Sequence, residues 1–266
     1  MKVNGKVIVV TGAGGGVGRE LVLQLLAKGA VVAAIDINKQ RLEETAKIAD
    51  KEEKLSIHVC DITNQDVVTQ VSKEIIELHK VVDGLINNAG IIQPFIKVND
   101  LDYGKINMVM NVNFYGTLYM IKAFLPHLLT RPEGHVLNVS SMGGFFPFPG
   151  QSIYGASKAA IKLLTEGLYA ELLDTNVNVT IVFPGAIATD IAKNSNVSMT
   201  VPKADEKPAM KMLPASDCAA IIINGMEKNK FQVYAGKDSK MMRFMYKLSP
   251  KAAIKMISKM MKDQIQ

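Results

Sequence analysis

The stretch Thr11-Gly12-Ala13-Gly14-Gly15-Gly16-Val17-Gly18 decides the fold of this chain. It directly follows an apolar run at 7–11 that predicts a buried strand, and it precedes an amphipathic run at 19–28 that predicts a helix. Glycines at such a junction let the backbone N–H groups of a helix N-terminus approach a pyrophosphate without interference from Cβ atoms. A glycine-rich surface turn would explain the composition but not its place between a strand and a helix. The pattern therefore predicts a dinucleotide-binding turn made by Gly12, Gly14, Gly15, Gly16, Val17 and Gly18.

Outward from this turn, short β-branched runs alternate with longer amphipathic runs. The predicted strands are 7–11, 31–35, 56–60, 84–87, 135–139, 177–183 and 231–234. The predicted helices are 19–28, 39–49, 67–79, 103–129, 153–173 and 216–228. This alternation predicts an α/β fold of the Rossmann type, a doubly wound parallel sheet with helices on both faces.

Length and composition place these elements in one domain, because 266 residues suffice for one large α/β core. We expect this domain to span 1–236, with the polar, proline-containing stretch 191–214 as a loop that covers the substrate. No apolar run approaches the ~20 residues that a membrane span needs, and none near the start suits a secretory signal, so we expect a cytoplasmic protein. Cys60 and Cys218 lie outside any metal-ligand spacing, and no metal site is predicted.

Asp36 follows the second predicted strand, 18 residues after Gly18. A carboxylate at this place accepts hydrogen bonds from the adenosine ribose hydroxyls and repels a 2′-phosphate, which favours NAD(H) over NADP(H). Two alternatives stay open. Lys39 or Arg41 could fold back and compensate the charge, and Asp36 could simply cap the following helix.

Tyr154 and Lys158 lie four residues apart in a predicted helix, so they project from one face. A nearby ammonium stabilises a phenolate and lowers the pKa of the phenol toward a range useful for acid/base chemistry. Such pairs also occur by chance, with a packed tyrosine and a solvated lysine. The pair alone is therefore weak evidence for catalysis.

The pair belongs to a larger set that resembles the short-chain dehydrogenase/reductase family. This set comprises Thr11-Gly-x-x-x-Gly-x-Gly18, Asn87-Asn-Ala-Gly90, Asn113, Ser141, Tyr154-x-x-x-Lys158 and Pro184-Gly185. Several independent motifs in one order, over about residues 5–190, make the resemblance specific.

The resemblance implies roles for individual residues. Tyr154 is similar to the catalytic acid/base, Lys158 to the residue that binds the nicotinamide ribose and lowers the tyrosine pKa, and Ser141 to the donor for the substrate oxygen. Asn113 resembles the residue that holds a water for proton relay, and Ser140 is a less well spaced alternative to Ser141. Further cofactor contacts are implied for Asp61, Ile62, Asn88, Ala89, Gly90, Pro184, Gly185, Ile187 and Thr189.

The end of the chain, 237–266, is a basic amphipathic extension that the family's core does not require. Arg243, Lys247, Lys251, Lys255 and Lys259 recur every fourth residue among methionines and other apolar side chains, and Pro250 predicts two separate helices. Three interpretations compete: a packing element for the substrate pocket or a neighbouring subunit, attachment to a membrane surface, and a helix for a partner protein. Nucleic-acid binding is disfavoured because aromatic residues do not alternate with the lysines.

Taken together, these motifs predict an NAD(H)-dependent oxidoreductase that moves a hydride between nicotinamide and a secondary alcohol or ketone. The abundance of methionine makes an apolar, lipid-like or steroid-like substrate an expectation. The alternatives are an NADPH-dependent reductase of carrier-linked 3-oxoacyl groups and a catalytically idle NAD-binding scaffold. The resemblance also implies a homodimer or homotetramer.

Overall fold

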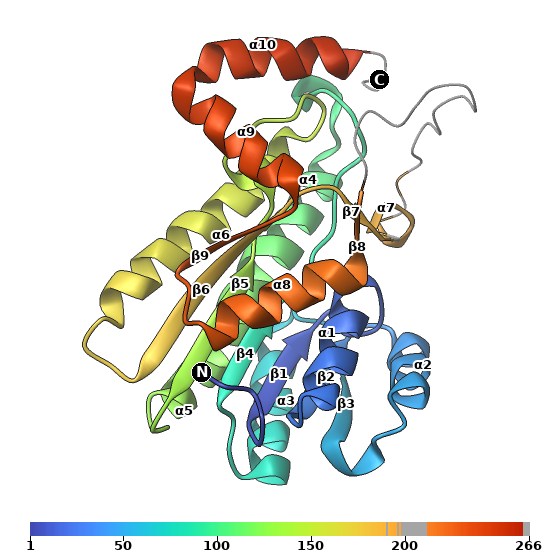
Figure 1. The fold of residues 1–266 in the computed structure, drawn as a ribbon. Helices are drawn as coiled ribbons and strands as arrows, with labels where there is room; N and C mark the ends of the chain where they lie inside the picture. Colours follow the sequence, from blue (N-terminus) through green and yellow to red (C-terminus); the bar gives the residue numbers. More distant parts are fainter. Residues whose placement is uncertain (190, 196, 198–211, 263–266) are drawn as a thin grey trace.

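The computed structural model of this chain describes residues 1–189, 191–195, 197 and 212–262. Its centre is a seven-stranded parallel sheet with the strand order β3-β2-β1-β4-β5-β6-β9 (Figure 1). The strands are β1 (Val7–Thr11), β2 (Val31–Asp36), β3 (Leu55–Val59), β4 (Gly84–Asn87), β5 (Gly134–Val139), β6 (Val177–Pro184) and β9 (Gln232–Ala235). The doubly wound parallel sheet predicted from the sequence is confirmed.

The helices are α1 (Gly16–Ala27), α2 (Lys39–Ala49), α3 (Gln65–His79), α4 (Tyr103–Met110), α5 (Thr117–Leu128), α6 (Ser152–Glu171), α7 (Ile191–Asn194), α8 (Ala215–Glu227), α9 (Lys237–Leu248) and α10 (Pro250–Met260). A short parallel pair, β7 (Ile187–Ala188) and β8 (Leu213–Pro214), lies outside the main sheet. Three-residue 3₁₀ turns are η1 (Glu52–Lys54), η2 (Val98–Asp100) and η4 (Met142–Gly144).

Both faces of the central strands are covered, which explains why β1 is apolar at every position from Val7 to Val10. In β1, Ile8 and Val10 pack with α1, α2 and α8, whereas Val7 and Val9 pack with α3, α5 and α6. Consecutive side chains of a strand point to opposite faces, so a strand covered on both faces needs apolar residues at every position.

The strand order reverses between β1 and β4, which are neighbouring strands in the centre of the sheet. The chain proceeds from β1 outward to β3 and then returns to β4 on the other side. At such a reversal the loops that follow the two strands diverge, and the resulting crevice at the carboxyl ends of the strands is where ligands bind in open α/β sheets. The fold thus places the glycine turn after β1 at the predicted cofactor site.

The predicted helix 103–129 is divided by a π-helical segment, η3 (Asn111–Gly116), between α4 and α5. The backbone continues in the right-handed helical conformation through both junctions, so the axis is not broken. Periodicity predicts where a helix runs but carries no signal for a single widened turn. Such turns are often found at functional sites.

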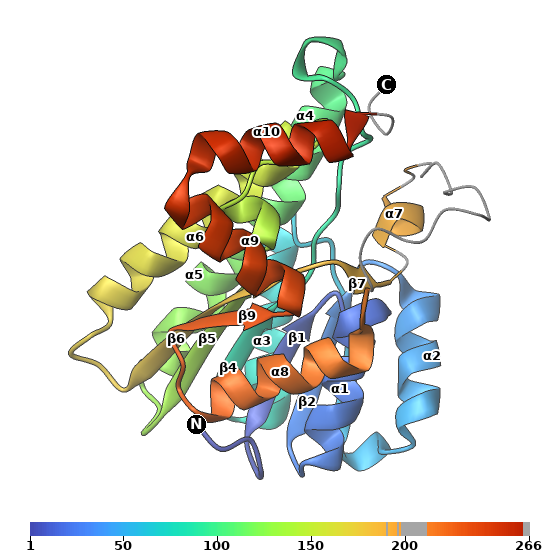
Figure 2. The same cartoon turned by 45° about the horizontal axis from the view of Figure 1, so that its top comes forward.

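The two C-terminal helices lie over one end of the molecule, across the carboxyl edge of the sheet (Figure 2). Pro250 occupies the first turn of α10, as expected for the residue that separates the two helices. The underside of α9 and α10 packs on Phe146 through Met242, Ala253 and Ile257, so these helices share a core with the loop that follows β5. No helix in the described ranges is both long and apolar enough to cross a membrane.

Candidate active site

The glycine turn after β1 adopts a backbone that only glycine tolerates well. Gly12 and Gly16 have φ of 67° and 52°, in the left-handed region. A Cβ on Gly12 would lie 2.9 Å from the Ala89 Cα, and one on Gly18 would collide with the Gly12 carbonyl. The turn is therefore packed closely against both the start of α1 and the loop after β4.

Asp36 stands at the end of β2 beside this turn. Its Oδ2 accepts a hydrogen bond from the Gly14 amide at 2.9 Å, and its Oδ1 accepts one from the Asn38 amide at 2.9 Å. The N-cap of α2 is Asn38, whose side chain accepts from the Arg41 amide. Asp36 therefore does not cap α2 itself, and its two hydrogen bonds hold the glycine turn and the start of α2 against the end of β2.

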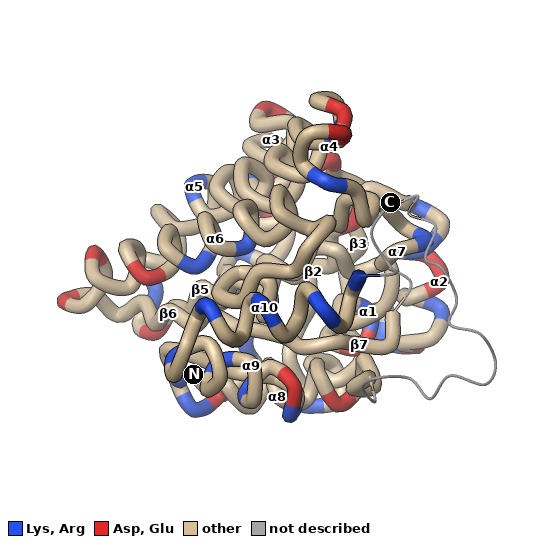
Figure 3. Tube along the Cα trace, turned by 90° about the horizontal axis from the view of Figure 1, so that it is seen from above, with Lys and Arg blue, Asp and Glu red and all other residues tan. Residues whose placement is uncertain are grey.

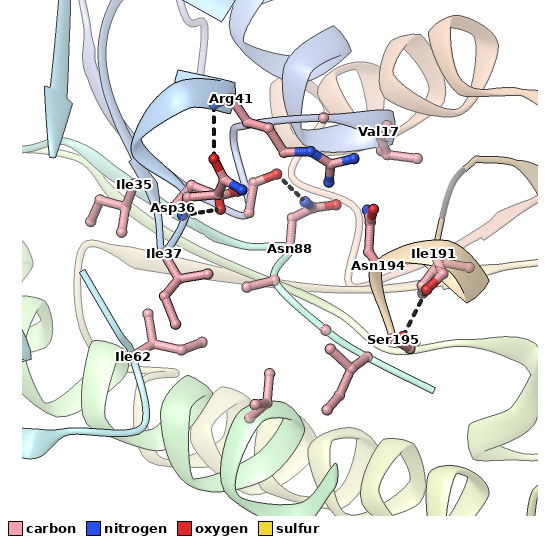
Figure 4. A pocket seen from close by; sticks show the side chains of 18 of the residues that line it. Val17, Ile35, Asp36, Ile37, Arg41, Ile62, Asn88, Ile191, Asn194 and Ser195 are labelled. Carbon is pink, nitrogen blue, oxygen red and sulfur yellow. Dashed lines mark hydrogen bonds between the residues drawn. The ribbon is translucent and has the colours of Figure 1, made fainter. Parts of the chain in front are cut away.

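Arg41 is the cation that folds back toward the glycine turn. Figure 4 shows its side chain reaching from α2 over the cleft, above Asp36, and it lines the cleft together with Gly15 and Gly16. A Cβ on Gly15 would lie 3.8 Å from an Arg41 guanidinium nitrogen. Lys39, in contrast, pairs with Glu43 at 3.6 Å on the surface of α2.

The opposite wall of the crevice comes from the loop after β4. The Thr11 hydroxyl accepts hydrogen bonds from the amides of Asn88 at 3.0 Å and Ala89 at 3.1 Å. The Asn88 side chain donates to the Thr11 carbonyl at 3.1 Å. Asn87 instead donates to Asn138 on β5 and braces the sheet, as expected for its place inside the strand.

These walls enclose a cleft of about 640 Å³, which is large enough for a substantial part of a dinucleotide. Eleven of the residues predicted to contact the cofactor line it: Gly12, Gly15, Gly16, Val17, Asp36, Asp61, Ile62, Asn88, Ala89, Gly90 and Thr189. The lining also includes residues that the sequence did not single out, among them Ile37, Cys60, Lys193, Asn194 and Ser195. Gly14, Gly18, Tyr154, Lys158, Pro184, Gly185 and Ile187, which were also predicted to contact the cofactor, do not line this cleft.

Tyr154 and Lys158 lie on one helix, α6, in the order and spacing expected. The Lys158 ammonium donates to the Val139 carbonyl at 3.1 Å and is 4 % exposed. A Cβ on Gly90 would lie 3.0 Å from this ammonium and 3.2 Å from the Asn113 Oδ1. Lys158 and Asn113 therefore meet at Gly90, on the wall of the cofactor cleft.

Gln93 fixes the start of α6 and was not predicted from the sequence. Its Oε1 accepts from the amides of Ile153 and Tyr154, both at 2.9 Å, and its Nε2 donates to the Gly150 carbonyl at 2.9 Å. These bonds satisfy backbone groups at the helix N-terminus, where no partner within the helix exists. Because Gln93 is fully buried and bonds the Tyr154 amide, it fixes the position of Tyr154 at the start of α6.

The two adjacent serines after β5 have different roles. Ser140 is buried and its hydroxyl donates to the Lys158 carbonyl at 2.8 Å, so it ties β5 to α6. Ser141 is the N-cap of η4 and its Oγ accepts from the Gly143 amide at 3.0 Å. Ser141 also hydrogen-bonds the Tyr154 hydroxyl, which places these two side chains together as the resemblance implied.

Asn113 sits in the π-helical segment and is fully buried. Its Oδ1 accepts from the Ile91 amide at 2.9 Å, and its Nδ2 donates to the Ile91 carbonyl at 3.0 Å and the Ser157 hydroxyl at 2.9 Å. Asn113 thereby joins the loop after β4 to α6. The widened turn gives its side chain a position that satisfies all three bonds.

Burial raises the pKa of the Tyr154 phenol, while the hydrogen bond with Ser141 acts in the opposite direction. Burial also lowers the pKa of Lys158, to about 8. The expected lowering of the tyrosine pKa by Lys158 is not among the causes found in the structure. Desolvation dominates both groups, so the site keeps the phenol protonated and the ammonium easy to deprotonate.

We expect Lys158→Met to stabilise the fold at pH 7 by about 3 kcal/mol, because a pKa lowered from 10.5 to about 8 measures the cost of keeping this ammonium buried. Between these two values the unfolded chain binds the proton and the folded chain does not. The stability of the unsubstituted protein therefore rises with pH across this window, and the advantage of the variant disappears above it. Urea unfolding at pH 7 and at pH 11 checks this prediction, and equal stabilities at pH 7 would contradict it.

The turn after β6 connects the site with the C-terminal helices. The Ala186 amide donates to an Asp238 carboxylate oxygen at 2.6 Å, and Asp238 lies in the first turn of α9. A Cβ on Gly185 would collide with the same carboxylate, which explains the glycine. Further along this segment, Thr189 packs near Gly16 of the glycine turn.

Two expectations from the sequence concern features that the structure shows only in part. The segment 191–214, expected to cover the substrate, falls mostly outside the described residues. Of its described part, α7 contributes Lys193 and Asn194 to the cleft lining, and Ser195 accepts from the Ile92 amide at 3.0 Å. Within the described ranges no group of three potential metal ligands occurs.

A Rossmann-type sheet, a glycine turn at the strand reversal and a tyrosine and lysine on the adjoining helix define a nicotinamide-dependent oxidoreductase. Residues 6–199 match the family described as short chain dehydrogenase. The chain is 33 % identical to an oxidoreductase named SadH from Mycobacterium tuberculosis, over 89 % of this chain and 88 % of the relative. This chain belongs to the short-chain dehydrogenase/reductase family, which confirms the resemblance noted in its sequence.

Two solved structures show the same fold. A short-chain dehydrogenase from Burkholderia cenocepacia, crystallised with NADP, has 29 % identity and a TM-score of 0.81, with 97 % of this chain and 99 % of that chain covered. A family member from Burkholderia phymatum, in complex with NAD, has 24 % identity and a TM-score of 0.80, with 88 % and 90 % covered. The likeness shows a shared fold, and the two neighbours themselves hold different forms of the nicotinamide cofactor.

Proposed function

We propose that this chain is an NAD(H)-dependent dehydrogenase or ketoreductase acting on a secondary alcohol or its ketone. The observation that carries the proposal is the arrangement around Gly90, where Lys158 and Asn113 meet at the wall of the cofactor cleft. Tyr154 lies one helical turn before Lys158 on α6, and its side chain lies beside Ser141, the N-cap of η4. An alcohol carbon placed between them would adjoin the cleft.

When bound, nicotinamide accepts or donates the hydride in this chemistry. The role of the chain is to orient the substrate oxygen and to move its proton. Ser141 donates a hydrogen bond to that oxygen. The Tyr154 hydroxyl gives its proton to the substrate oxygen in reduction, and its deprotonated phenolate oxygen receives the alcohol proton in oxidation. Since burial favours the neutral phenol, a protonated Tyr154 is available as the acid for ketone reduction.

Lys158 and Asn113 position the other partners of the reaction. The buried Lys158 ammonium beside Gly90 is placed to hold the nicotinamide ribose, and its lowered pKa allows it to exchange a proton near neutral pH. Asn113 holds the loop after β4 against α6, which fixes the position of Gly90 relative to the helix that carries Tyr154.

An apolar substrate suits the surroundings of Ser141. The loop that follows it contributes Met142, Phe145 and Phe148 to a cluster with Phe146, and α9 contributes Met245 from the other side. Methionine side chains adapt to irregular apolar ligands. We therefore propose a hydrophobic alcohol or ketone as the substrate.

The cofactor preference rests on Asp36, which we expect to favour NAD(H). Asp36→Asn keeps an acceptor for the Gly14 amide but removes a charge that would repel a 2′-phosphate by about 4 kcal/mol per charge pair at 4 Å and an effective dielectric constant near 20. Arg41 offsets part of this repulsion. We expect the ratio of kcat/KM for NADPH to that for NADH to rise at least about tenfold in Asp36→Asn.

The same experiment tests the proposed function as a whole. A panel of aliphatic and cyclic ketones and carrier-linked 3-oxoacyl groups is assayed with NADH and NADPH side by side. Arg41→Ala serves as the matched variant and should weaken only the use of NADPH. An unchanged ratio in Asp36→Asn contradicts the cofactor assignment, reduction of the carrier-linked groups with NADPH alone favours the acyl reductase, and an inactive protein that still binds NADH favours the idle scaffold.

The expected homo-oligomer stays a prediction. Leu163 and Leu173, on and just after α6, are 70 % and 62 % exposed, which leaves apolar surface on this helix for a second copy.

A further inference from the structure

The outer surface of α9 combines large apolar side chains with lysines. Met241, Phe244 and Leu248 are 45 %, 63 % and 70 % exposed. Their spacing of three and four residues aligns them along one stripe of the helix. Three exposed lysines, Lys237, Lys240 and Lys247, lie on the same outward side. The opposite side of the helix is buried through Ser239 and Met242.

The surface continues over α10, where exposed lysines outnumber the exposed large apolar side chains. Lys251, Lys255 and Lys259 recur every fourth residue and are exposed, while Ala253 and Ile257 are buried against the molecule. Figure 3 shows these lysine positions along the helix, seen from above, with no acidic position among them. Ile254 and Met260 add exposed apolar side chains at the margins.

The charge of the whole chain is concentrated here. Residues 237–266 contain eight lysines and arginines and two aspartates, which gives this segment +6, the entire formal net charge of the protein. Residues 1–236 contain 23 residues of each sign. Within the described residues none of the seven lysines of this segment forms an ion pair, and Asp238 is bound to the Ala186 amide.

We propose that the exposed faces of α9 and α10 bind the surface of an anionic lipid bilayer. Lysines beside an apolar stripe suit this partner because the ammonium groups contact the headgroups while Phe244, Leu248 and Met241 enter the boundary with the acyl chains. A second copy of this chain does not suit the surface, since two strongly basic faces repel each other. A nucleic acid would use the lysines and leave the three large apolar side chains in water.

Binding of α9 and α10 to a bilayer would place the candidate active site close to the membrane. The undersides of α9 and α10 pack on Phe146, five residues after Ser141. Asp238 joins α9 to the turn that begins at Gly185. If the substrate class is hydrophobic, as proposed above, a bilayer is where it would be most concentrated, although the binding itself does not depend on that assignment.

Vesicle binding of the full chain tests the proposal. We expect it to sediment with vesicles of equal parts phosphatidylglycerol and phosphatidylcholine, weakly or not at all with phosphatidylcholine alone, and less as salt concentration rises. Replacing Lys251, Lys255 and Lys259 by Glu should reduce the partition coefficient by more than about a hundredfold, since each lysine near an anionic surface is worth about fivefold. Phe244→Ser should also reduce it.

Matched variants distinguish this surface from general charge attraction. Lys47, Lys73 and Lys228, exposed lysines of α2 and α3 and at the end of α8, are replaced together by Glu for the same change in net charge, and Leu78→Ser replaces a 60 % exposed residue of α3. These variants should keep most of the binding. NADH binding and thermal unfolding verify that every variant is folded.

Three results would overturn the proposal. One is equal binding to neutral vesicles. Another is unchanged binding after the triple substitution in α10 or after Phe244→Ser. The third is retention on duplex DNA without any binding to anionic vesicles, which would identify a nucleic acid as the partner. Because vesicle binding requires no turnover, failure of this test leaves the proposed enzymatic function unaffected.

Discussion

Tyr154→Phe should lower kcat by about 10²–10⁴-fold with every accepted substrate, which is the usual contribution of a positioned acid or base. Only the hydroxyl is removed. The Tyr154 backbone amide remains bound to Gln93 and the ring remains beside Gly143, so the helix and the pocket keep their shape. The loss should therefore appear in kcat, because the substrate oxygen no longer has a proton donor in the transition state.

Cofactor binding provides the control for this variant. NADH fluorescence titration should give the same dissociation constant as for the unsubstituted protein, since the phenol does not line the cofactor cleft. Tyr103→Phe removes a hydroxyl from an 81 % exposed tyrosine of α4 and should leave kcat unchanged. Full activity of Tyr154→Phe would require another group to supply the proton and would end the proposed mechanism.

Gln93→Leu should destabilise the fold by about 4 kcal/mol and lower kcat as well. The substitution keeps the approximate size of the side chain but leaves the amides of Ile153 and Tyr154 and the carbonyl of Gly150 without their partner. Each buried polar group left unsatisfied costs about 1–3 kcal/mol. The first turn of α6, which carries Tyr154, would lose its anchor, and urea unfolding together with steady-state kinetics measures both effects.

Gln93→Glu separates positioning from stability. Its carboxylate can accept from both amides but cannot donate to Gly150, so we expect most of the kcat to return while part of the stability loss remains. Because Gln93 acts through the position of Tyr154, the effect should fall on kcat rather than on the KM for NADH. A Gln93→Leu enzyme with unchanged kcat would show that α6 holds Tyr154 in place without this residue.

The fold was predictable because local patterns and tertiary structure agree in this chain. The ranges 7–11, 39–49 and 84–87 are observed as β1, α2 and β4 without shift, and each is bounded by a glycine, by a capping asparagine or by a strong change in polarity. Other elements differ by one to three residues at their ends, where side-chain caps and 3₁₀ turns decide the boundary. The π-helical turn left no trace in the periodicity, and the bonds that its Asn113 makes with Ile91 join residues 22 positions apart.

The candidate site was predictable where residues act through their order along the chain. The pair in α6 and the glycine turn are of this kind. Gln93 was not predictable because its partners lie some 60 positions away and nothing in its own neighbourhood marks it. The same holds for the side-chain direction of Arg41, which only the packing of α2 on the glycine turn determines. The role expected for Lys158 in lowering the tyrosine pKa depended on distance and burial, and burial dominates.

The bond between Asp238 and the Ala186 amide limits how the C-terminal helices can be studied by truncation. Ending the chain at Gly236 would remove this carboxylate and also the Ser239 hydroxyl that donates to the Phe183 carbonyl at 2.7 Å. It would also uncover Phe146. A shortened protein would therefore lose activity through a disturbed turn after β6, even if the helices had no function of their own. Surface substitutions are the informative way to assign the helices a function.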